Sequence, residues 1–408
     1  MNRMLVILVC LAVCTVAGIF VANEINREGG ETAAAANLPD DAAGGEIAAA
    51  ILPDGAAASN TAGTVSQTAP PMPLSTEPDS PEPDTPMTLS SEPDTPEVLL
   101  PEPTTPEPLS PEPVPPESPE KSAAIAVNFG PYIRGLSAEE DSDIPDEIFR
   151  EILDLLRPTT DTIRTFTISG PLERLYPILQ NEYPEMRVFA GAWIDRDFTR
   201  EQIYAELDKL IELGNSGLAD FLLCGSENIL RGDHSASEVA QWVTYVRENL
   251  TRDIPVSTSD TPDSYSAQLI DAVSAVCVTY YPYWNGVAAE NAAADIEGMV
   301  TSLKERAGGK EIIISETGFP DYGDSVGEAV VNQENARIYF EYVYEWSKES
   351  GTLCIVFSAI NEAWKGRYET DPEANFGLFY EDGTVKPAYA EILRRIASER
   401  ELEKSENS

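Results

Sequence analysis

Short apolar runs alternate with amphipathic stretches from residue 121 to the C-terminus, and this alternation constrains the fold more than any other feature. The apolar runs lack polar alternation, as is typical of strands buried on both faces; they are 124–129, 162–167, 187–192, 221–224, 254–257, 275–280, 311–315 and 353–359. The stretches between them place apolar residues at helical spacing; they predict helices over 145–156, 172–180, 199–213, 236–250, 265–271, 292–306, 333–349 and 386–400. Strands that are each followed by a helix predict an α/β fold, a (β/α)8 TIM barrel formed by one domain over residues 121–408.

The first 27 residues predict a signal anchor or a signal peptide. Met4 to Ala22 carries no charge, and nineteen residues at ~1.5 Å each can cross a bilayer core of ~30 Å. Arg3 precedes the run and acidic residues follow it, so the bulk of the chain is expected beyond the membrane. We favour an uncleaved anchor over a secreted product, because the run contains no well-placed small-x-small cleavage site.

Residues 28–120 predict a disordered, acidic, Pro-rich linker. Units such as Glu77-Pro78-Asp79-Ser80-Pro81 and Glu92-Pro93-Asp94-Thr95-Pro96 recur in it. Proline removes backbone donors and fixes φ, so helix and sheet are both excluded. The segment should be an extended chain stiffened by its repelling carboxylates. We expect a stalk that holds the following domain away from a membrane.

The charge and the scarce metal ligands exclude several classes of function. The net charge is -43, and from Lys121 onward 51 acidic residues stand against 25 basic ones. Such a surface repels nucleic acid, so no nucleic-acid partner is expected. Cys224, Cys277 and Cys354 lie in separate apolar runs, which predicts buried thiols without disulfides. His234 is the only histidine, and we expect it in a solvated loop, with no metal site, no cofactor and a monomeric chain.

The carboxyl ends of the strands hold the candidate site, because loops at that end build the active sites of such barrels. Glu316 directly follows Ile312-Ile313-Ile314-Ser315, and Gly318 and Pro320 end the strand soon after it. Glu227 follows the apolar run 221–224 in the same way. A carboxylate at a buried strand end usually has a partner or a function, although a structural, hydrogen-bonded Glu is the alternative.

Further polar and aromatic residues stand at the other strand ends: Asn128 and Tyr132, Arg164, Trp193, Ser226, Tyr281 and Trp284, and Glu362, Trp364 and Lys365. Aromatic rings stack on the apolar faces of sugars, and carboxylates bind sugar hydroxyls. The fourth and seventh strands lie nearly opposite one another in an eight-stranded barrel, so Glu227 and Glu316 should face each other. Two carboxylates across a sugar are typical of glycoside hydrolysis.

These residues resemble glycoside hydrolase family 17, the β-1,3-glucanases, over residues 124–393. Glu316-Thr317-Gly318-Phe319-Pro320 is similar to that family's E-T-G-W-P nucleophile motif, and Gly225-Ser226-Glu227 is similar to its G-N-E acid/base motif. Tyr281-Pro282-Tyr283-Trp284, Glu362-Ala363-Trp364-Lys365 and Phe376-Gly377-Leu378-Phe379 resemble three further segments. The bacterial and archaeal members resemble this chain more than the plant enzymes do.

The resemblance implies a retaining β-glycosidase that hydrolyses or transglycosylates β-1,3-glucan or a related extracellular polysaccharide. Glu316 would be the nucleophile and Glu227 the acid/base. Arg164 would keep Glu316 ionised, or form a structural ion pair. Tyr281 would bind Glu316 or pack in the core.

Substrate binding is assigned to all of the further strand-end residues, which include Asn128, Tyr132, Arg164, Ser226 and Tyr281. Glu362 and Lys365 would contact the substrate, or form a loop ion pair, while Trp193, Trp284 and Trp364 are candidate sugar platforms.

Ser226 departs from the family pattern, which has Asn before the acid/base to bind the sugar 2-hydroxyl. The shorter side chain indicates a lost or water-mediated bond, or a different sugar. The alternative function is therefore a non-catalytic, glycan-binding cell-surface barrel, which turnover of laminarin-type oligosaccharides would exclude.

Overall fold

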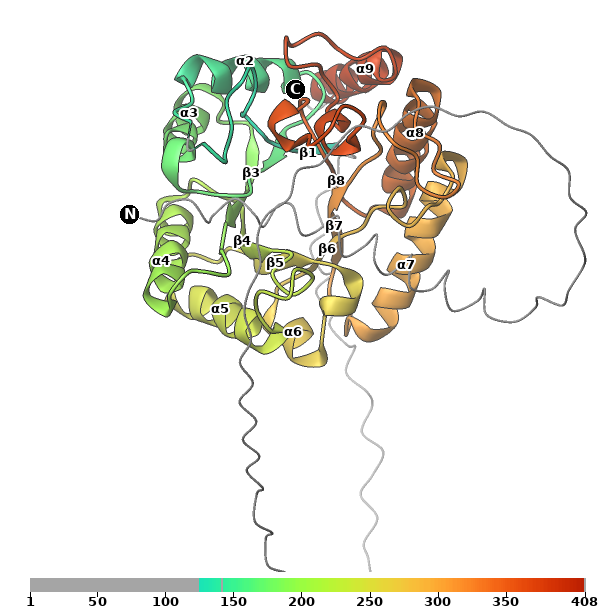
Figure 1. The fold of residues 1–408 in the computed structure, drawn as a ribbon. Coiled ribbons are helices and arrows are strands. Elements are labelled where there is room, and N and C mark those ends of the chain that lie inside the picture. The colour runs from blue at the N-terminus through green and yellow to red at the C-terminus, as the bar shows by residue number, and fades with distance from the viewer. Residues whose placement is uncertain (1–124, 141, 407–408) are drawn as a thin grey trace, which may run out of the picture. The chain divides into compact units, whose positions relative to one another are not determined.

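Eight parallel strands close into a barrel with helices around it in the computed structural model of this protein, which describes residues 125–140 and 142–406 (Figure 1). The strands are β1 (Ala126–Asn128), β2 (Thr162–Arg164), β3 (Arg187–Ala192), β4 (Phe221–Ser226), β5 (Val256–Asp260), β6 (Val276–Thr279), β7 (Ile312–Thr317) and β8 (Cys354–Val356). Each strand pairs in parallel with the next, and β8 pairs with β1. This topology confirms the predicted TIM barrel.

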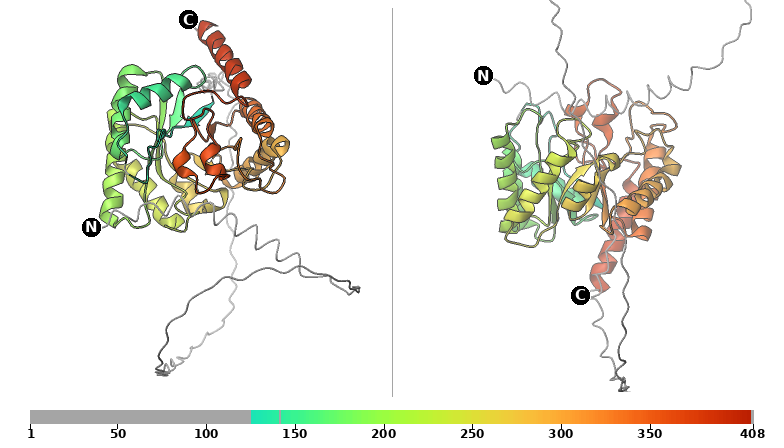
Figure 2. Two further views of the ribbon diagram at one scale, coloured as in Figure 1. Left: turned by 45° about the horizontal axis from the view of Figure 1, so that its top comes forward. Right: turned by 90° about the horizontal axis from the view of Figure 1, so that it is seen from below.

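Helices follow the strands and form the outer ring. The α-helices are α2 (Asp146–Leu156), α3 (Leu175–Glu182), α4 (Arg200–Ser216), α5 (Ala236–Asn249), α6 (Ala267–Ala272), α7 (Ala292–Arg306), α8 (Gln333–Ser350) and α9 (Ala390–Glu406). Short 3-10 helices lie in the connections: η1 (Gly170–Arg174), η2 (Pro262–Ser264), η3 (Ala289–Asn291), η4 (Ala363–Lys365) and η5 (Pro372–Asn375). Figure 2 shows that α9 runs on beyond the neighbouring helices, and its last turns are exposed.

Local sequence signals start two of these helices. Thr199 accepts a hydrogen bond from the backbone of Gln202 ahead of α4, and the Gln202 side chain bonds back to the Thr199 backbone. Ser235 and Glu238 form the same reciprocal capping box ahead of α5. Such boxes satisfy backbone donors that a helix leaves unpaired, so they fix where each helix begins.

The structure shifts several predicted boundaries. β4 extends past the predicted end at residue 224 to Ser226, and β5 covers Val256–Asp260 instead of 254–257. The predicted helix 172–180 divides into η1 and α3. The last helix begins at Ala390 instead of residue 386, because the Lys386 side chain is buried against Asp321 and its segment turns inward.

The barrel has two apolar layers, as expected for strands buried on both faces. A small cluster fills the interior, and its members alternate along the strands with outward-facing residues; it consists of Ala126, Phe189, Phe221, Leu223, Ala275, Cys277, Ile313 and Ile355. The rings of Phe189 and Phe221 stack with centroids 4.7 Å apart. A larger cluster joins the strands to the surrounding helices.

A polar layer lies in the barrel next to this apolar interior, toward the carboxyl ends of the strands. Ser259 and Ser315 share a hydrogen bond of 2.7 Å between their hydroxyls. Arg164 donates to the backbone carbonyl of Ser315 at 2.8 Å, and Asn128 contacts the same carbonyl at 3.4 Å. These hydrogen bonds form a rigid base for the side chains at the strand ends.

The expectations for the N-terminus and the cysteines have different outcomes. The predicted anchor and linker, residues 1–120, lie outside the described residues, so they stay predictions. Within 125–140 and 142–406, the structure contains no helix of the length and apolar character needed to cross a bilayer.

Cys224, Cys277 and Cys354 are buried and unpaired, as predicted.

Candidate active site

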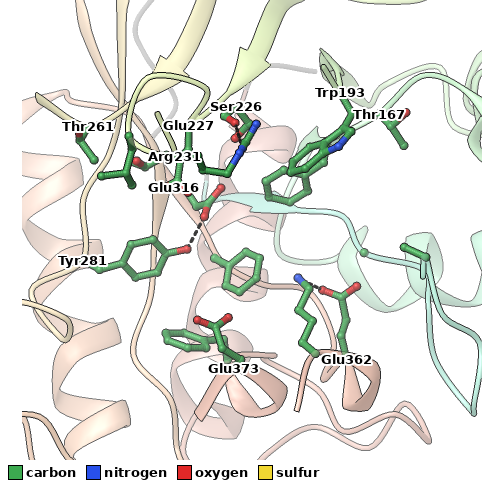
Figure 3. A pocket seen from close by; sticks show the side chains of 18 of the residues that line it. Thr167, Trp193, Ser226, Glu227, Arg231, Thr261, Tyr281, Glu316, Glu362 and Glu373 are labelled. Atoms are coloured by element: carbon green, nitrogen blue, oxygen red, sulfur yellow. Dashed lines mark hydrogen bonds and ion pairs between the residues drawn. The ribbon is translucent and has the colours of Figure 1, made fainter. Parts of the chain in front are cut away.

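Glu227 and Glu316 line one cavity of about 1060 Å³ at the carboxyl ends of the strands (Figure 3). The register of β7 against β6 and β8 is irregular around Glu316. The register of β4 against β5 is irregular between Leu223 and Ser226, next to Glu227. Irregularities of this kind re-aim side chains beside active sites. The structure therefore brings together the two carboxylates that the sequence singled out.

Both carboxylate oxygens of Glu316 have a partner. Arg164 Nη1 lies 2.8 Å from Oε2, and the Tyr281 hydroxyl donates to Oε1 at 2.7 Å. The exposed fraction of the Arg164 side chain is 1%, so the guanidinium is a fixed, dry positive charge. These two contacts hold the Glu316 carboxylate in one orientation.

Arg164 and Asn128 lie beneath the cavity and do not line it. Arg164 also donates to Asn128 Oδ1 at 3.2 Å and to the Ser226 hydroxyl at 2.9 Å. Asn128 is fully buried, and its amide contacts the carbonyls of Ser315 and Ile355. The protein itself surrounds both side chains, so Asn128 and Arg164 support the cavity from beneath, and their contact with substrate stays a prediction.

Glu227 lies in a different environment. Removal from water is the largest cause that raises the pKa of its carboxyl group, and the charges of Glu316 and Asp260 add to it. The Thr279 hydroxyl and the Arg231 charge act in the opposite direction. Burial and like charges both favour the neutral carboxylic acid, so Glu227 keeps its proton well above the usual range of a glutamate.

Glu362, Trp364 and Lys365 form a connected group at another wall of the cavity. Lys365 Nζ lies 2.6 Å from Glu362 Oε2, and Trp364 Nε1 donates to Glu362 Oε1 at 3.1 Å. Gly130 permits this arrangement, since a β-carbon there would come within 2.5 Å of Glu362 Oε1. The Tyr132 ring packs edge-on against Trp364 at 5.9 Å between centroids.

Three tryptophans that were predicted as sugar platforms line the cavity. Trp193 is half-buried, and the Arg231 guanidinium lies 4.7 Å from its ring centroid. Trp284 packs against Tyr283, with centroids 4.6 Å apart. Each of these rings is supported by a neighbour, which fixes its orientation toward the cavity.

The sequence reasoning missed several residues that line or support the cavity. Glu373 lines it beside Tyr281 (Figure 3), and Arg231 lines it while paired with Asp233 at 2.7 Å. Asp260 lies behind the Glu227 loop as the last residue of β5. The rule of strand ends would have found Asp260 if β5 had been predicted to its full length.

A buried ion pair joins two loops that follow neighbouring strands. Lys386 Nζ lies 2.5 Å from Asp321 Oδ1 and donates to the Asn375 carbonyl at 2.8 Å. Asp321 follows β7, and Asn375 ends η5, which contributes Glu373 to the cavity. The pair therefore fixes the loop after β7 against the loop after β8.

His234 differs from the prediction of a solvated loop residue. Its ring is half-buried and packs edge-on against Trp242, with centroids 4.8 Å apart.

A parallel eight-stranded barrel with two carboxylates in one cavity at the carboxyl ends of β4 and β7 defines a class of glycoside-hydrolase-like barrels. The sequence profile of the BtgE/BtgC glycoside hydrolase domain matches residues 126–377. This chain belongs to that family.

Individual relatives agree with the family. The chain is 27% identical over 248 residues to a probable glucan endo-1,3-beta-glucosidase btgC of Aspergillus terreus, covering 54% of this chain and 37% of that protein. It is 26% identical over 262 residues to the glucan 1,3-beta-glucosidase BGL2 of Candida albicans, covering 58% and 84%. The chain thus spans little more than a third of the Aspergillus protein and most of the Candida one.

Solved structures share the barrel. A glycoside hydrolase family 17 beta-1,3-glucanosyltransferase of Rhizomucor miehei superposes with a TM-score of 0.58 at 25% identity, covering 65% of this chain and 96% of that one. An endo-laminarinase from Formosa Hel1_33_131 superposes with a TM-score of 0.57 at 18% identity, covering 68% and 88%. The second likeness concerns the fold alone.

Proposed function

We propose that this protein is a retaining β-glycosidase that acts on β-1,3-glucan. The observation that carries this proposal is the opposite surroundings of two carboxylates in one cavity. Glu316 is bound by the Arg164 guanidinium and the Tyr281 hydroxyl, whereas burial and neighbouring carboxylates raise the pKa of Glu227. One group is suited to attack and the other to donate a proton.

The reaction would take two steps. A Glu316 oxygen attacks the anomeric carbon, the bond to the leaving oxygen breaks, and Glu227 gives its proton to that oxygen. In the second step, Glu227 takes a proton from water or from a sugar hydroxyl, whose oxygen attacks the same carbon and releases Glu316. Arg164 supplies the counter-charge of the ionised nucleophile, and Tyr281 orients it.

Several features support a neutral glucan as the substrate. The cavity volume of about 1060 Å³ slightly exceeds the range of ~300–1,000 Å³ that is common for small-ligand sites, which leaves room for more than one sugar ring. Acidic and basic residues both line the cavity, and Lys365 is paired with Glu362 at 2.6 Å, so the described residues of its walls hold no unopposed positive patch of the kind that would attract an anionic polysaccharide. The relatives from Aspergillus and Candida are named for activity on 1,3-β-glucan.

Ser226 takes a defined place in this proposal. Its hydroxyl accepts a hydrogen bond from Arg164 at 2.9 Å and lines the cavity. The hydroxyl proton is then available for a sugar oxygen beside Glu316. Tyr132, Trp193, Tyr281, Trp284, Glu362, Trp364 and Lys365 are proposed to contact substrate with it.

Hydrolysis and transglycosylation use the same first step and differ in the acceptor. The Rhizomucor relative is named a glucanosyltransferase, so we propose that this protein transfers glucan as well as hydrolysing it. A product longer than the substrate, detected by mass spectrometry, would identify the transfer.

The proposal also covers the cellular location of the enzyme and its oligomeric state. We propose that residues 1–27 anchor or export the chain, that residues 28–120 form a stalk, and that the barrel acts outside the cell as a monomer. The bacterial or archaeal type stays a prediction, since the named sequence relatives are fungal.

The stereochemistry of the product tests the mechanism. A retaining enzyme releases the β-anomer first from a β-glucan, which proton NMR detects before mutarotation. First release of the α-anomer would exclude Glu316 as a covalent nucleophile. Binding of laminarin-type oligosaccharides without any turnover would favour the alternative, a glycan-binding barrel.

A further inference from the structure

The loop after β4 holds Glu227 in an unusual backbone conformation. Its φ of +53° lies in the left-handed region, which residues with a β-carbon disfavour. The Glu227 backbone N–H donates to the Ser259 carbonyl at 2.7 Å. A residue in this region persists only where its surroundings fix it, and such residues gather at functional sites.

Asp260 provides this fixation from the end of β5. Its side chain is fully buried. Its Oδ2 accepts the backbone N–H of Ile229 at 2.8 Å, and its Oδ1 accepts the backbone N–H of Leu230 at 3.2 Å. These are the second and third residues after Glu227, so Asp260 holds the turn where the chain leaves Glu227.

The same carboxylate is tied to its own loop. Oδ1 also accepts the backbone N–H of Thr261 at 2.9 Å and the Ser264 hydroxyl at 2.6 Å. All four donors are neutral, so they fix the carboxylate without cancelling its charge. Burial raises the pKa of Asp260, whereas these four hydrogen bonds lower it. In its ionised form, Asp260 joins the loops after β4 and β5 and places a negative charge beside Glu227.

We propose that Asp260 is a positioning residue for the acid/base carboxylate: it fixes the turn that aims Glu227 into the cavity, and its charge keeps a proton on Glu227. This inference rests on the proposed glycosidase function. Asp260 does not line the cavity, so it acts through Glu227 and not through the substrate.

The groups around Glu227 support the electrostatic part. Glu316 on β7 and Asp260 on β5 both raise the pKa of Glu227, while Arg231 on its own loop and Thr279 on β6 lower it. Tyr281, which follows β6, is also close enough for the charge of Glu227 to raise the pKa of its hydroxyl, after the larger effects of burial and Glu316. Glu316 touches the reacting sugar in the proposed mechanism, so Asp260 is the negative charge that can be removed without changing substrate contacts.

The variant Asp260→Asn tests the proposal with two substrates. One is a laminarin oligosaccharide, whose leaving sugar needs a proton, and the other is an aryl β-glucoside with a good leaving group. Full loss of a general acid costs about 10²–10⁴-fold in rate. We expect kcat/KM of Asp260→Asn to fall about 10- to 100-fold on the oligosaccharide and by no more than about threefold on the aryl glucoside.

The pH profile gives a second readout that a purely structural role would not move. Removal of a negative charge lowers the pKa of Glu227, so the basic limb of kcat/KM on the oligosaccharide should move to lower pH. The matched control is Asp195→Asn, another buried carboxylate beyond a strand end, which accepts the Asp197 backbone N–H at 3.0 Å. Its basic limb and its ratio of the two activities should equal those of the wild type.

The outcomes separate a failure of the proposed glycosidase function from a failure of the positioning role of Asp260. A wild-type protein that is inactive on both substrates overturns the proposed function and this inference with it. An active wild type whose Asp260→Asn variant loses both activities equally, or keeps its basic limb, overturns the inference alone. If Asp260→Asn does not fold, Ser264→Ala replaces it. That variant removes the shortest bond to Asp260, so the ratio of oligosaccharide to aryl activity must fall, and an unchanged ratio overturns the proposal.

Discussion

Replacement of Arg164 by methionine should lower the free energy of unfolding by about 3 kcal/mol, because it leaves the Glu316 carboxylate without its counter-charge. Arg164 Nη1 lies 2.8 Å from Glu316 Oε2, and the exposed fractions of the two side chains are 1% and 10%. Removal of one member of a buried pair costs about 3–5 kcal/mol. The exposed edge of Glu316 lets water compensate part of the loss. We therefore expect the cost of removing Arg164 to lie at the lower end of this energy range.

The expected loss can be measured as a melting temperature. In a domain of this size, 1 kcal/mol corresponds to about 2–4 °C, so Arg164→Met should melt about 6–12 °C below the wild type. The assay is thermal unfolding followed by circular dichroism. Arg150→Met is the matched control, because Arg150 pairs with Glu182 at 2.8 Å on the surface, and surface pairs contribute only about 0–1 kcal/mol.

A double variant identifies the source of the loss. Glu316→Gln added to Arg164→Met removes the uncompensated charge, so the double variant should melt well above Arg164→Met alone. The reasoning is refuted if Arg164→Met melts within about 2 °C of the wild type, or if the second substitution recovers nothing.

Three further predictions follow from the site and the sequence. Glu316→Gln should abolish turnover with an intact fold, since an amide is a poor nucleophile; activity within about tenfold of the wild type would exclude Glu316 from this role. The wild type should stay active well above the usual pKa range of a carboxyl group, because the reaction needs protonated Glu227 and burial raises its pKa; a pH–rate profile whose basic limb lies near pH ~4.3 would contradict this. Cleavage of the chain near Lys121 should release a soluble, active barrel with an unchanged melting temperature, whereas aggregation would indicate that residues 28–120 pack on it.

The sequence predicted the barrel because apolar patterning reports burial directly. The strand over 187–192 and the helix over 292–306 have the predicted bounds. β5 was placed too early because it continues as Ser257-Thr258-Ser259-Asp260, whose polar side chains resemble a loop. In the structure these residues are buried in the polar layer, a tertiary environment that no local pattern records.

The candidate site was predictable where a residue stands at a strand end. Glu227, Glu316, Tyr281 and Glu362 line the cavity by that rule. Glu373 was missed because it lies in η5, far beyond the end of β8. Position in the sequence does not indicate there whether a side chain points into the cavity. The depth of a side chain was equally hidden: Asn128 stands at a strand end as predicted but is covered by its neighbours.

The buried pair between Lys386 and Asp321 has a consequence for how such an enzyme can change. Two separate loops meet there, since Asp321 follows β7, while Lys386 and the Asn375 carbonyl that it bonds at 2.8 Å both lie between β8 and α9. Transplanting the loop after β8 from a relative, to alter which glucan is accepted, would remove Lys386 and leave Asp321 buried without its counter-charge wherever the new loop has no matching lysine. The loops after β7 and β8 therefore form one exchangeable module, and engineered or natural recombination should succeed only when both loops move together.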